Sequence, residues 1–122
     1  MKLGELEVYK ISRDISREVW IIYKKFNWHE KKIIGDQWIR SVDSISANIA
    51  EGFGRFHFLD KNKFNYNARG SLLESFDWTD KLLERKYVTE EEYDSIMKKL
   101  RLCHKKLNRY IQTTKDQVNK IK

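Results

Sequence analysis

Four stretches of the chain carry apolar residues at steps of three and four, which is the spacing of one face of an α-helix. The first stretch, about residues 5 to 26, has the series Val8, Ile11, Ile15, Val19, Ile22 and Phe26. Similar series predict helices at about 30 to 52, 61 to 86 and 90 to 119. We therefore predict an all-α protein, a single domain folded as an antiparallel up-down-up-down four-helix bundle.

Local signals at the ends of these stretches support the same division. Capping boxes are predicted at 27–30 and 89–92, where Asn or Thr is followed three residues later by Glu. Asp60 is a suitable N-cap for the third helix. Gly52 or Gly54 is expected to close the second helix in the left-handed conformation.

The composition agrees with long helices in a reducing compartment. The 122 residues include no Pro and only five Gly, and 35% of them are charged. The single Cys, Cys103, excludes an internal disulfide and a zinc site built on several cysteines. The N-terminus lacks the apolar run of a signal peptide, and no stretch is apolar enough for a membrane span, so we expect a cytoplasmic protein without a membrane partner.

The formal charge of +7 is concentrated near the C-terminus. Residues 95 to 122 contain nine Lys or Arg and one acid, Asp116, so this segment carries +8. Such a segment can bind phosphate backbones or an acidic protein, or it can be a solvated helix face. The candidate nucleic-acid-binding residues are Lys98, Lys99, Arg101, Lys105, Lys106 and Arg109. Four of them follow helical steps and can share one face, namely Lys98, Arg101, Lys105 and Arg109.

Catalytic and metal-binding patterns are weak in this sequence. The three His lie on different predicted elements and none has the spacing of a helical metal motif, so we expect no metal and no cofactor. The fragments GFG and GRF do not form a phosphate-binding loop. Glu51 and Glu74 could act as an acid and a base, but nearby Arg residues favour a structural ion-pair network. We predict no catalytic residue.

A second, small and polar stripe runs beside the apolar face of the second helix, at Gln37, Ser41, Ser44, Asn48 and Glu51 or Gly52. The third helix carries a matching series at Ala68, Ser71 and Ser75, with Gly70 beside it. Small residues allow close packing, and buried polar groups there fix the register of two helices. We favour this interpretation, with Asn48, Glu51, Arg69 and Ser71 as satisfied interior groups, over a ligand site.

At these residues the chain resembles a family of four-helix-bundle proteins first described as products of intervening sequences in bacterial 23S ribosomal RNA genes. The resemblance covers about residues 5 to 115 and rests on SxxxNIAEGFGR at 44–55, preceded by Gln37 and Arg40, and on ARGSLLE at 68–74. The motif positions, which we assign to structure and assembly, are Gln37, Arg40, Ser44, Asn48, Glu51, Gly52, Arg55, Arg69, Gly70, Ser71 and Glu74. In one departure, Ser46 stands where the family commonly has Pro, so a Pro kink is not expected here.

The resemblance implies a bundle that assembles into a ring-like homopentamer without a known enzyme activity. Some relatives accompany reverse transcriptases of diversity-generating retroelements and bind the polymerase and RNA through a basic surface. Our first hypothesis is therefore a non-catalytic, pentameric scaffold that binds RNA or DNA, or a ribonucleoprotein, through the basic residues of the fourth helix. This scaffold would be an accessory to a reverse transcriptase.

Two other hypotheses remain open at the level of sequence. The first is a protein-interaction module that presents aromatic side chains to a partner such as a polymerase; its candidates are Tyr9, Trp20, Tyr23, Phe56 and Phe58. The second is a small enzyme that uses Glu51, Arg55 and Arg69. Salt-insensitive capture of one specific protein would favour the interaction module over the nucleic-acid scaffold.

Overall fold

Four long helices make up the protein in a computed structural model that describes residues 1–121. They are α1 (Glu7–Tyr23), α3 (Asp36–Phe53), α4 (Phe58–Glu84) and α5 (Glu90–Ile121). Two short segments, a 3₁₀ turn at Leu3–Glu5 and α2 (Trp28–Glu30), precede α1 and α3, and a π-helical turn at Lys31–Gly35 joins α2 to α3. All regular secondary structure in the described residues is helical.

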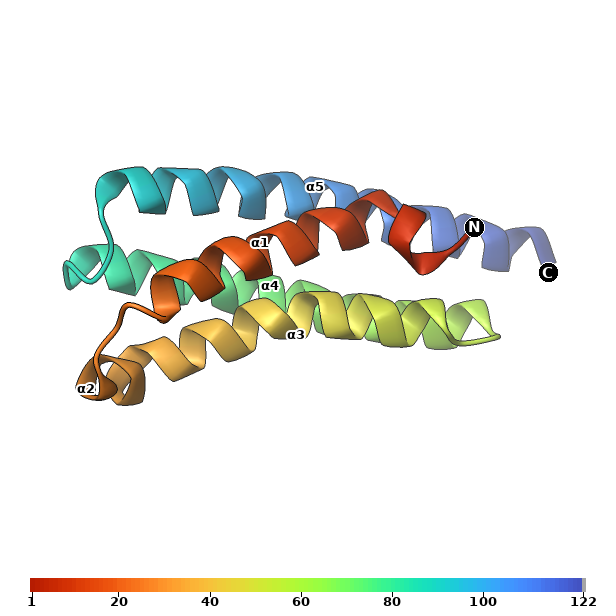
Figure 1. Ribbon diagram of the computed structural model, residues 1–122. Helices are drawn as coiled ribbons and strands as arrows, with labels where there is room; N and C mark the ends of the chain where they lie inside the picture. Colours follow the sequence, from red (N-terminus) through yellow and green to blue (C-terminus); the bar gives the residue numbers. More distant parts are fainter. Residues whose placement is uncertain (122) are drawn as a thin grey trace.

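The helices run alternately up and down, as the sequence predicts (Figure 1). In Figure 1 the N-terminus, the C-terminus and the α3–α4 turn lie at one end of the bundle, with the other two connections at the opposite end. Each helix contacts its two neighbours, in the order α1, α3, α4, α5 and back to α1. The predicted all-α, four-helix bundle is confirmed.

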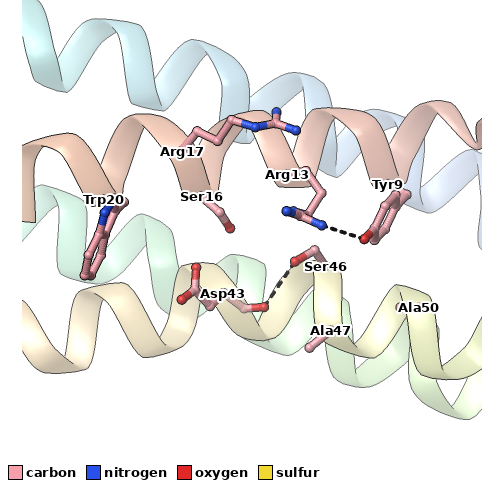
Figure 2. A pocket seen from close by; sticks show the side chains of 9 residues that line it. All are labelled: Tyr9, Arg13, Ser16, Arg17, Trp20, Asp43, Ser46, Ala47 and Ala50. Carbon is pink, nitrogen blue, oxygen red and sulfur yellow. Dashed lines mark hydrogen bonds between the residues drawn. The ribbon is translucent and has the colours of Figure 1, made fainter. Parts of the chain in front are cut away.

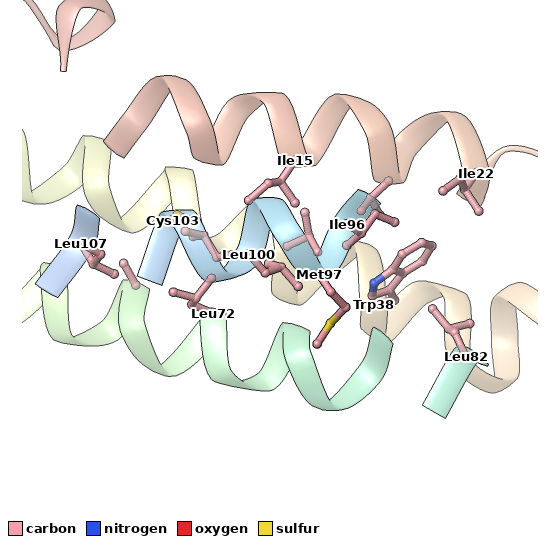
Figure 3. Close-up of a cluster of buried hydrophobic side chains, with 14 of the residues drawn as sticks. Ile15, Ile22, Trp38, Leu72, Leu82, Ile96, Met97, Leu100, Cys103 and Leu107 are labelled. Atoms are coloured by element: carbon pink, nitrogen blue, oxygen red, sulfur yellow. The ribbon is translucent and has the colours of Figure 1, made fainter. Parts of the chain in front are cut away.

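All four helices contribute fully buried side chains to one hydrophobic core (Figure 3). Ile15, Trp38, Leu72 and Leu100 represent α1, α3, α4 and α5, and each is inaccessible to solvent. Cys103 is also fully buried, and burial raises the pKa of its thiol from 9.0 to about 12. A thiol in this state is neutral and unreactive, as its place on the apolar face predicts.

Both predicted capping boxes are present. At the start of α2, Asn27 Oδ1 accepts from the Glu30 amide at 2.8 Å, and Glu30 Oε1 accepts from the Asn27 amide at 2.8 Å. At the start of α5, the same reciprocal bonds join Thr89 and Glu92 at 3.1 and 2.9 Å. These boxes set where the second and fourth predicted helices begin.

The predicted cap of the third helix is wrong. Helix α4 begins at Phe58, and its N-cap is His57, which makes no side-chain capping bond. Asp60 lies inside the first turn instead, where its negative charge interacts favourably with the positive end of the helix dipole.

The predicted left-handed glycine at the end of the second helix is also wrong. Within residues 1–121 no glycine has a positive φ, and α3 ends at Gly54 with φ −77° and ψ −7°. Lys61 Nζ donates to the Phe53 carbonyl at 2.9 Å. This bond satisfies a terminal carbonyl of α3 that a left-handed cap would otherwise help to satisfy.

The left-handed residue that ends a helix is instead Lys86, with φ 63°. The Tyr87 amide donates to the Leu82 carbonyl at 2.8 Å, and the Lys86 amide donates to the Leu83 carbonyl at 3.0 Å. This pair of bonds is the Schellman motif, in which glycine is the favoured left-handed residue. A side chain with a Cβ in this conformation costs about 1–2 kcal/mol.

We therefore expect Lys86→Gly to raise the free energy of unfolding by about 1 kcal/mol, because it removes the steric cost at the α4 terminus. Urea unfolding followed by circular dichroism measures the change. Lys86→Ala is the matched control, since it removes the same charge but keeps the Cβ. If Ala and Gly raised stability equally, the left-handed strain would not be the cause.

Four neutral groups, the hydroxyls of Tyr23, Tyr93 and Tyr110 and the thiol of Cys103, have raised pKa values and make stability sensitive to alkaline pH. The Tyr23 hydroxyl donates to Asp36 at 2.6 Å and the Tyr93 hydroxyl donates to Asp80 at 2.7 Å. These hydrogen bonds, followed by burial, raise both tyrosine pKa values above 10.0. Burial raises the pKa of the Cys103 thiol in the same way. Each folded pKa exceeds its unfolded value, so each stabilising contribution is present below the unfolded pKa and is lost as the pH rises through the folded pKa.

The free energy of unfolding should therefore decrease as the pH rises from about 9 towards 12. Urea titrations across this range measure the decrease. In a Tyr23→Phe/Tyr93→Phe variant, which cannot ionise at either position, the decrease above about pH 10 should be smaller. An unchanged decrease would exclude the two tyrosines as its source.

Candidate functional site

Four exposed basic side chains lie along α5, on the face that the helical steps predict. They are Lys98, Arg101, Lys105 and Arg109, and we call them the basic stripe. None of the four forms a salt bridge within residues 1–121. Their positive charges are therefore directed to solvent and available to a polyanion.

The other two predicted nucleic-acid residues have a structural role. Lys99 Nζ lies 2.9 Å from Asp14 and 2.7 Å from Glu18, and Lys106 Nζ lies 3.2 Å from Glu7. Burial lowers the pKa of Lys99, but the bonds to its two carboxylates outweigh burial and leave that pKa raised. Both lysines lie on the side of α5 that faces α1, where they link the two helices. Of the six residues predicted to bind nucleic acid, the four of the basic stripe therefore have no acidic partner within residues 1–121, whereas Lys99 and Lys106 are paired.

The serines of the two predicted polar stripes meet between α3 and α4, as predicted. Trp38 Nε1 donates to Thr79 Oγ1 at 3.0 Å. Two pairs of serine hydroxyls follow along the same line, Ser41 with Ser75 at 3.2 Å and Ser44 with Ser71 at 3.0 Å. We call these three pairs the polar seam. Residue numbers rise on α3 as they fall on α4, so the seam fixes one antiparallel register.

Asn48 and Gly52 continue this line towards the end of α3. Asn48 Nδ2 donates to the Ser44 carbonyl at 2.9 Å and to the Ser44 hydroxyl at 3.0 Å. Gly52 is buried against α4, and a Cβ placed on it would lie 2.8 Å from the Lys61 carbonyl oxygen. The glycine is required because the two backbones approach too closely for any side chain.

The remaining motif residues are not interior groups. Gln37, Arg40, Glu51, Arg55, Gly70 and Glu74 are exposed. Glu51 and Arg55 form an ion pair of 2.7 Å with each other, and their side chains are 54% and 45% exposed. Arg69 lies on the other side of α4, where it donates to Asn108 Oδ1 at 3.1 Å. The interior roles predicted for Glu51 and Arg69 are therefore wrong, and the outward half of the motif is not explained by packing within one chain.

A groove of about 470 Å³ between α1 and α3 was missed at the level of sequence (Figure 2). Its lining consists of Tyr9, Arg13, Ser16, Arg17 and Trp20 from α1 and Asp43, Ser46, Ala47 and Ala50 from α3. A signal for it exists, because Arg13, Arg17 and Trp20 follow steps of four and three and lie on one helix face. The same spacing also fits an ordinary solvent-exposed helix face, so the spacing alone does not distinguish a groove from such a face.

The described residues hold no cluster that could bind a metal ion. No cluster of three or more His, Cys, Asp or Glu within residues 1–121 has metal-binding geometry. Glu51 pairs with Arg55 at 2.7 Å, and Glu74 is exposed on α4. No helix in this part of the chain is both long and apolar enough to cross a membrane.

Comparison with known proteins agrees with the fold and the motif. The family model of the 23S rRNA-intervening sequence proteins matches residues 4–109. A crystal structure of a protein of unknown function from the S23 ribosomal protein family of Bacteroides thetaiotaomicron is similar, with 28% sequence identity and a TM-score of 0.78. The match covers 85% of this chain and 97% of that chain, and no curated protein matched. The chain therefore belongs to the family of 23S rRNA-intervening sequence proteins.

Proposed function

We propose that the protein is a non-catalytic, homo-oligomeric scaffold that binds RNA, alone or within a ribonucleoprotein, through the basic stripe of α5. The observation that carries this proposal is the set of four exposed basic side chains on one helix face, all without an acidic partner in residues 1–121. The neighbouring Lys99 and Lys106 form salt bridges with carboxylates of α1. The positive charge of the basic stripe, in contrast, is not used in ion pairs between helices.

The exposed half of the family motif supports assembly into a homo-oligomer, with a pentamer as the expected number. Arg40 and Glu74 are exposed on α3 and α4, and neither makes a salt bridge in the described residues. Charged and polar residues that a family motif retains without a role inside one chain are suited to contacts between chains. In a ring the basic stripe is repeated around one axis, so a polyanion contacts several copies at once and binds more tightly.

A basic stripe of this kind should bind RNA with a strong dependence on charge and a weak dependence on base sequence. The test is fluorescence anisotropy with a structured RNA hairpin and an unrelated hairpin of equal length, titrated from about 50 to 300 mM salt. We expect similar affinities for both hairpins and a loss of at least about tenfold over this range. Affinity that was independent of salt, or no binding at low salt, would contradict the proposal.

A second candidate function, a protein-interaction module, is supported by one feature of the α3–α4 turn. Phe56 is 90% exposed and Leu59 is 71% exposed, and they lie three residues apart at this end of the bundle. Trp20 is 50% exposed on α1. Of the other aromatic candidates, Tyr23 is held by its bond to Asp36 and does not offer a free hydroxyl. Capture of one protein at high salt, lost on Phe56→Ser, would favour this second function.

A further inference from the structure

The groove between α1 and α3 combines positive charge, an exposed aromatic ring and small residues on its floor (Figure 2). We propose that this groove binds a nucleotide of a single-stranded nucleic acid, with the phosphate held by arginines and the base stacked on Trp20. The inference rests on the proposed function and extends it, because it adds contacts specific for unpaired bases to a surface that recognises charge. The two sites lie on different helices, since the basic stripe belongs to α5.

Arg13 extends its guanidinium group towards the groove, and Arg17 lines the groove from the same helix (Figure 2). Arg13 Nη1 donates to the Tyr9 hydroxyl at 2.9 Å, and the Arg13 guanidinium carbon lies 5.8 Å from the centroid of the Tyr9 ring. This contact holds the guanidinium in place and leaves its other N–H groups free to bind a phosphate. Arg17, one turn along α1, is exposed and makes no salt bridge within residues 1–121. The pair can therefore bind the backbone of a strand that follows α1.

Trp20 provides the stacking surface at the other end of the groove. Its ring stacks on Tyr23, with centroids 5.5 Å apart and an angle of 24° between the planes. The Tyr23 hydroxyl is in turn bonded to Asp36, so the aromatic pair is anchored to α3. Half of the Trp20 surface remains exposed. A preorganised, half-exposed indole beside arginines is the arrangement used to bind single strands, because every base has a face that can stack.

The opposite wall carries polar groups without bulk. Ala47 and Ala50 leave space, and the Ser46 hydroxyl donates to the Asp43 carbonyl at 3.3 Å. The buried Ser16 hydroxyl has no hydrogen-bond partner among the described residues. The Asp43 carboxylate makes no salt bridge there and repels a phosphate placed close to it. The Asp43 carboxylate can instead accept hydrogen bonds from the donor groups of a base or a ribose. The phosphate then lies on the α1 side of the groove.

The size of the groove agrees with this occupant. A volume of about 470 Å³ falls within the range of roughly 300–1,000 Å³ that small-ligand sites have. The groove extends from Tyr9 to Trp20, which is eleven residues or about 16 Å along a helix. A strand that lies along it can place a base on Trp20 and a phosphate against Arg17 and Arg13.

The test compares a single-stranded RNA of mixed sequence, about ten nucleotides long, with the same sequence in a duplex. Affinities are measured by anisotropy for the wild type, Trp20→Leu, Trp20→Phe and Arg17→Gln. We expect Trp20→Leu to weaken single-strand binding by roughly tenfold and to leave duplex binding unchanged, because a duplex offers no unstacked base. Trp20→Phe should retain most of the affinity, and Arg17→Gln should weaken single-strand binding more than duplex binding.

Three results would overturn the inference. The first is a Trp20→Leu variant that binds both RNAs as the wild type does, or loses both equally. The second is a free nucleoside monophosphate that competes at the same concentration as the oligonucleotide, because the groove would then be a small-molecule site. The third is a changed oligomeric mass of Trp20→Leu by light scattering, which would identify the groove as a subunit contact.

Failure of the proposed function of the basic stripe would give a different set of results from failure of the groove site. If Lys105→Glu/Arg109→Glu left duplex binding unchanged while Trp20→Leu still reduced single-strand binding, the stripe would be excluded and the groove would stand. If only the stripe variant had an effect, the groove would be excluded and the stripe would stand.

Discussion

Replacing Gly52 by Ala should destabilise the protein by about 2 kcal/mol, because α3 and α4 meet there without room for a methyl group. The added Cβ would lie 2.8 Å from the Lys61 carbonyl oxygen and 3.0 Å from the Phe64 Cβ. The first of these is a backbone atom of the facing helix, so the strain is relieved only if the helices separate. Separation would also stretch the hydrogen bonds of the polar seam. Urea unfolding or thermal melting measures the loss.

Gly70→Ala is the matched control, since it makes the same chemical change inside an α-helix. No atom lies within 4 Å of a Cβ built at Gly70, and this residue is exposed. Alanine is favoured over glycine within a helix, so Gly70→Ala should raise the free energy of unfolding by about 1 kcal/mol. The two variants should thus differ by about 3 kcal/mol. If both were stabilised equally, the close approach at Gly52 would not constrain the fold.

Reversing two charges of the basic stripe, with Lys105→Glu/Arg109→Glu, should reduce the affinity for a structured RNA by about a hundredfold at low salt. Two phosphate contacts are lost, and two repulsive charges are added in the C-terminal half of the basic stripe. The slope of log affinity against log salt should also become shallower by about two, because each lost contact releases one counterion fewer. Both residues are exposed and make no salt bridge in residues 1–121, so the fold should be unaffected.

Lys25→Glu/Lys63→Glu is the control for net charge. These lysines are exposed and lie away from the stripe, on the turn after α1 and on α4, and the variant carries the same change of −4. Because attraction by net charge alone acts over a distance and is screened by salt, this variant should lose affinity only slightly. An equal loss in both variants would assign binding to overall charge rather than to the stripe.

The sequence could predict the polar seam because both of its helices repeat small residues at helical spacing. Ser41, Ser44, Ser71 and Ser75 meet as expected, and the capping boxes lie where local spacing places them. In each case the residue pattern within a single segment is enough to predict the feature. The existence of the helices and their capping boxes, which depend on such local patterns, was therefore predictable.

Other features depend on how the helices are rotated against one another, which local patterns do not contain. Lys99 and Lys106 lie on a face of α5 beside the stripe, and only the position of the α1 carboxylates shows that they are paired. Arg69 belongs to the family motif, yet it lies on the side of α4 that faces α5. The left-handed cap at Lys86 could not be foreseen either, because the usual residue for that position is glycine.

Size-exclusion chromatography with light scattering decides whether an oligomer of this protein binds RNA by charge. The mass of the wild-type protein would be measured with and without a structured RNA at about 50 and 300 mM salt. We expect a homo-oligomer, five chains by the family resemblance, whose mass increases by that of bound RNA at the lower salt only. A protein that remained monomeric, or an oligomer whose mass did not change with RNA at either salt, would contradict this expectation.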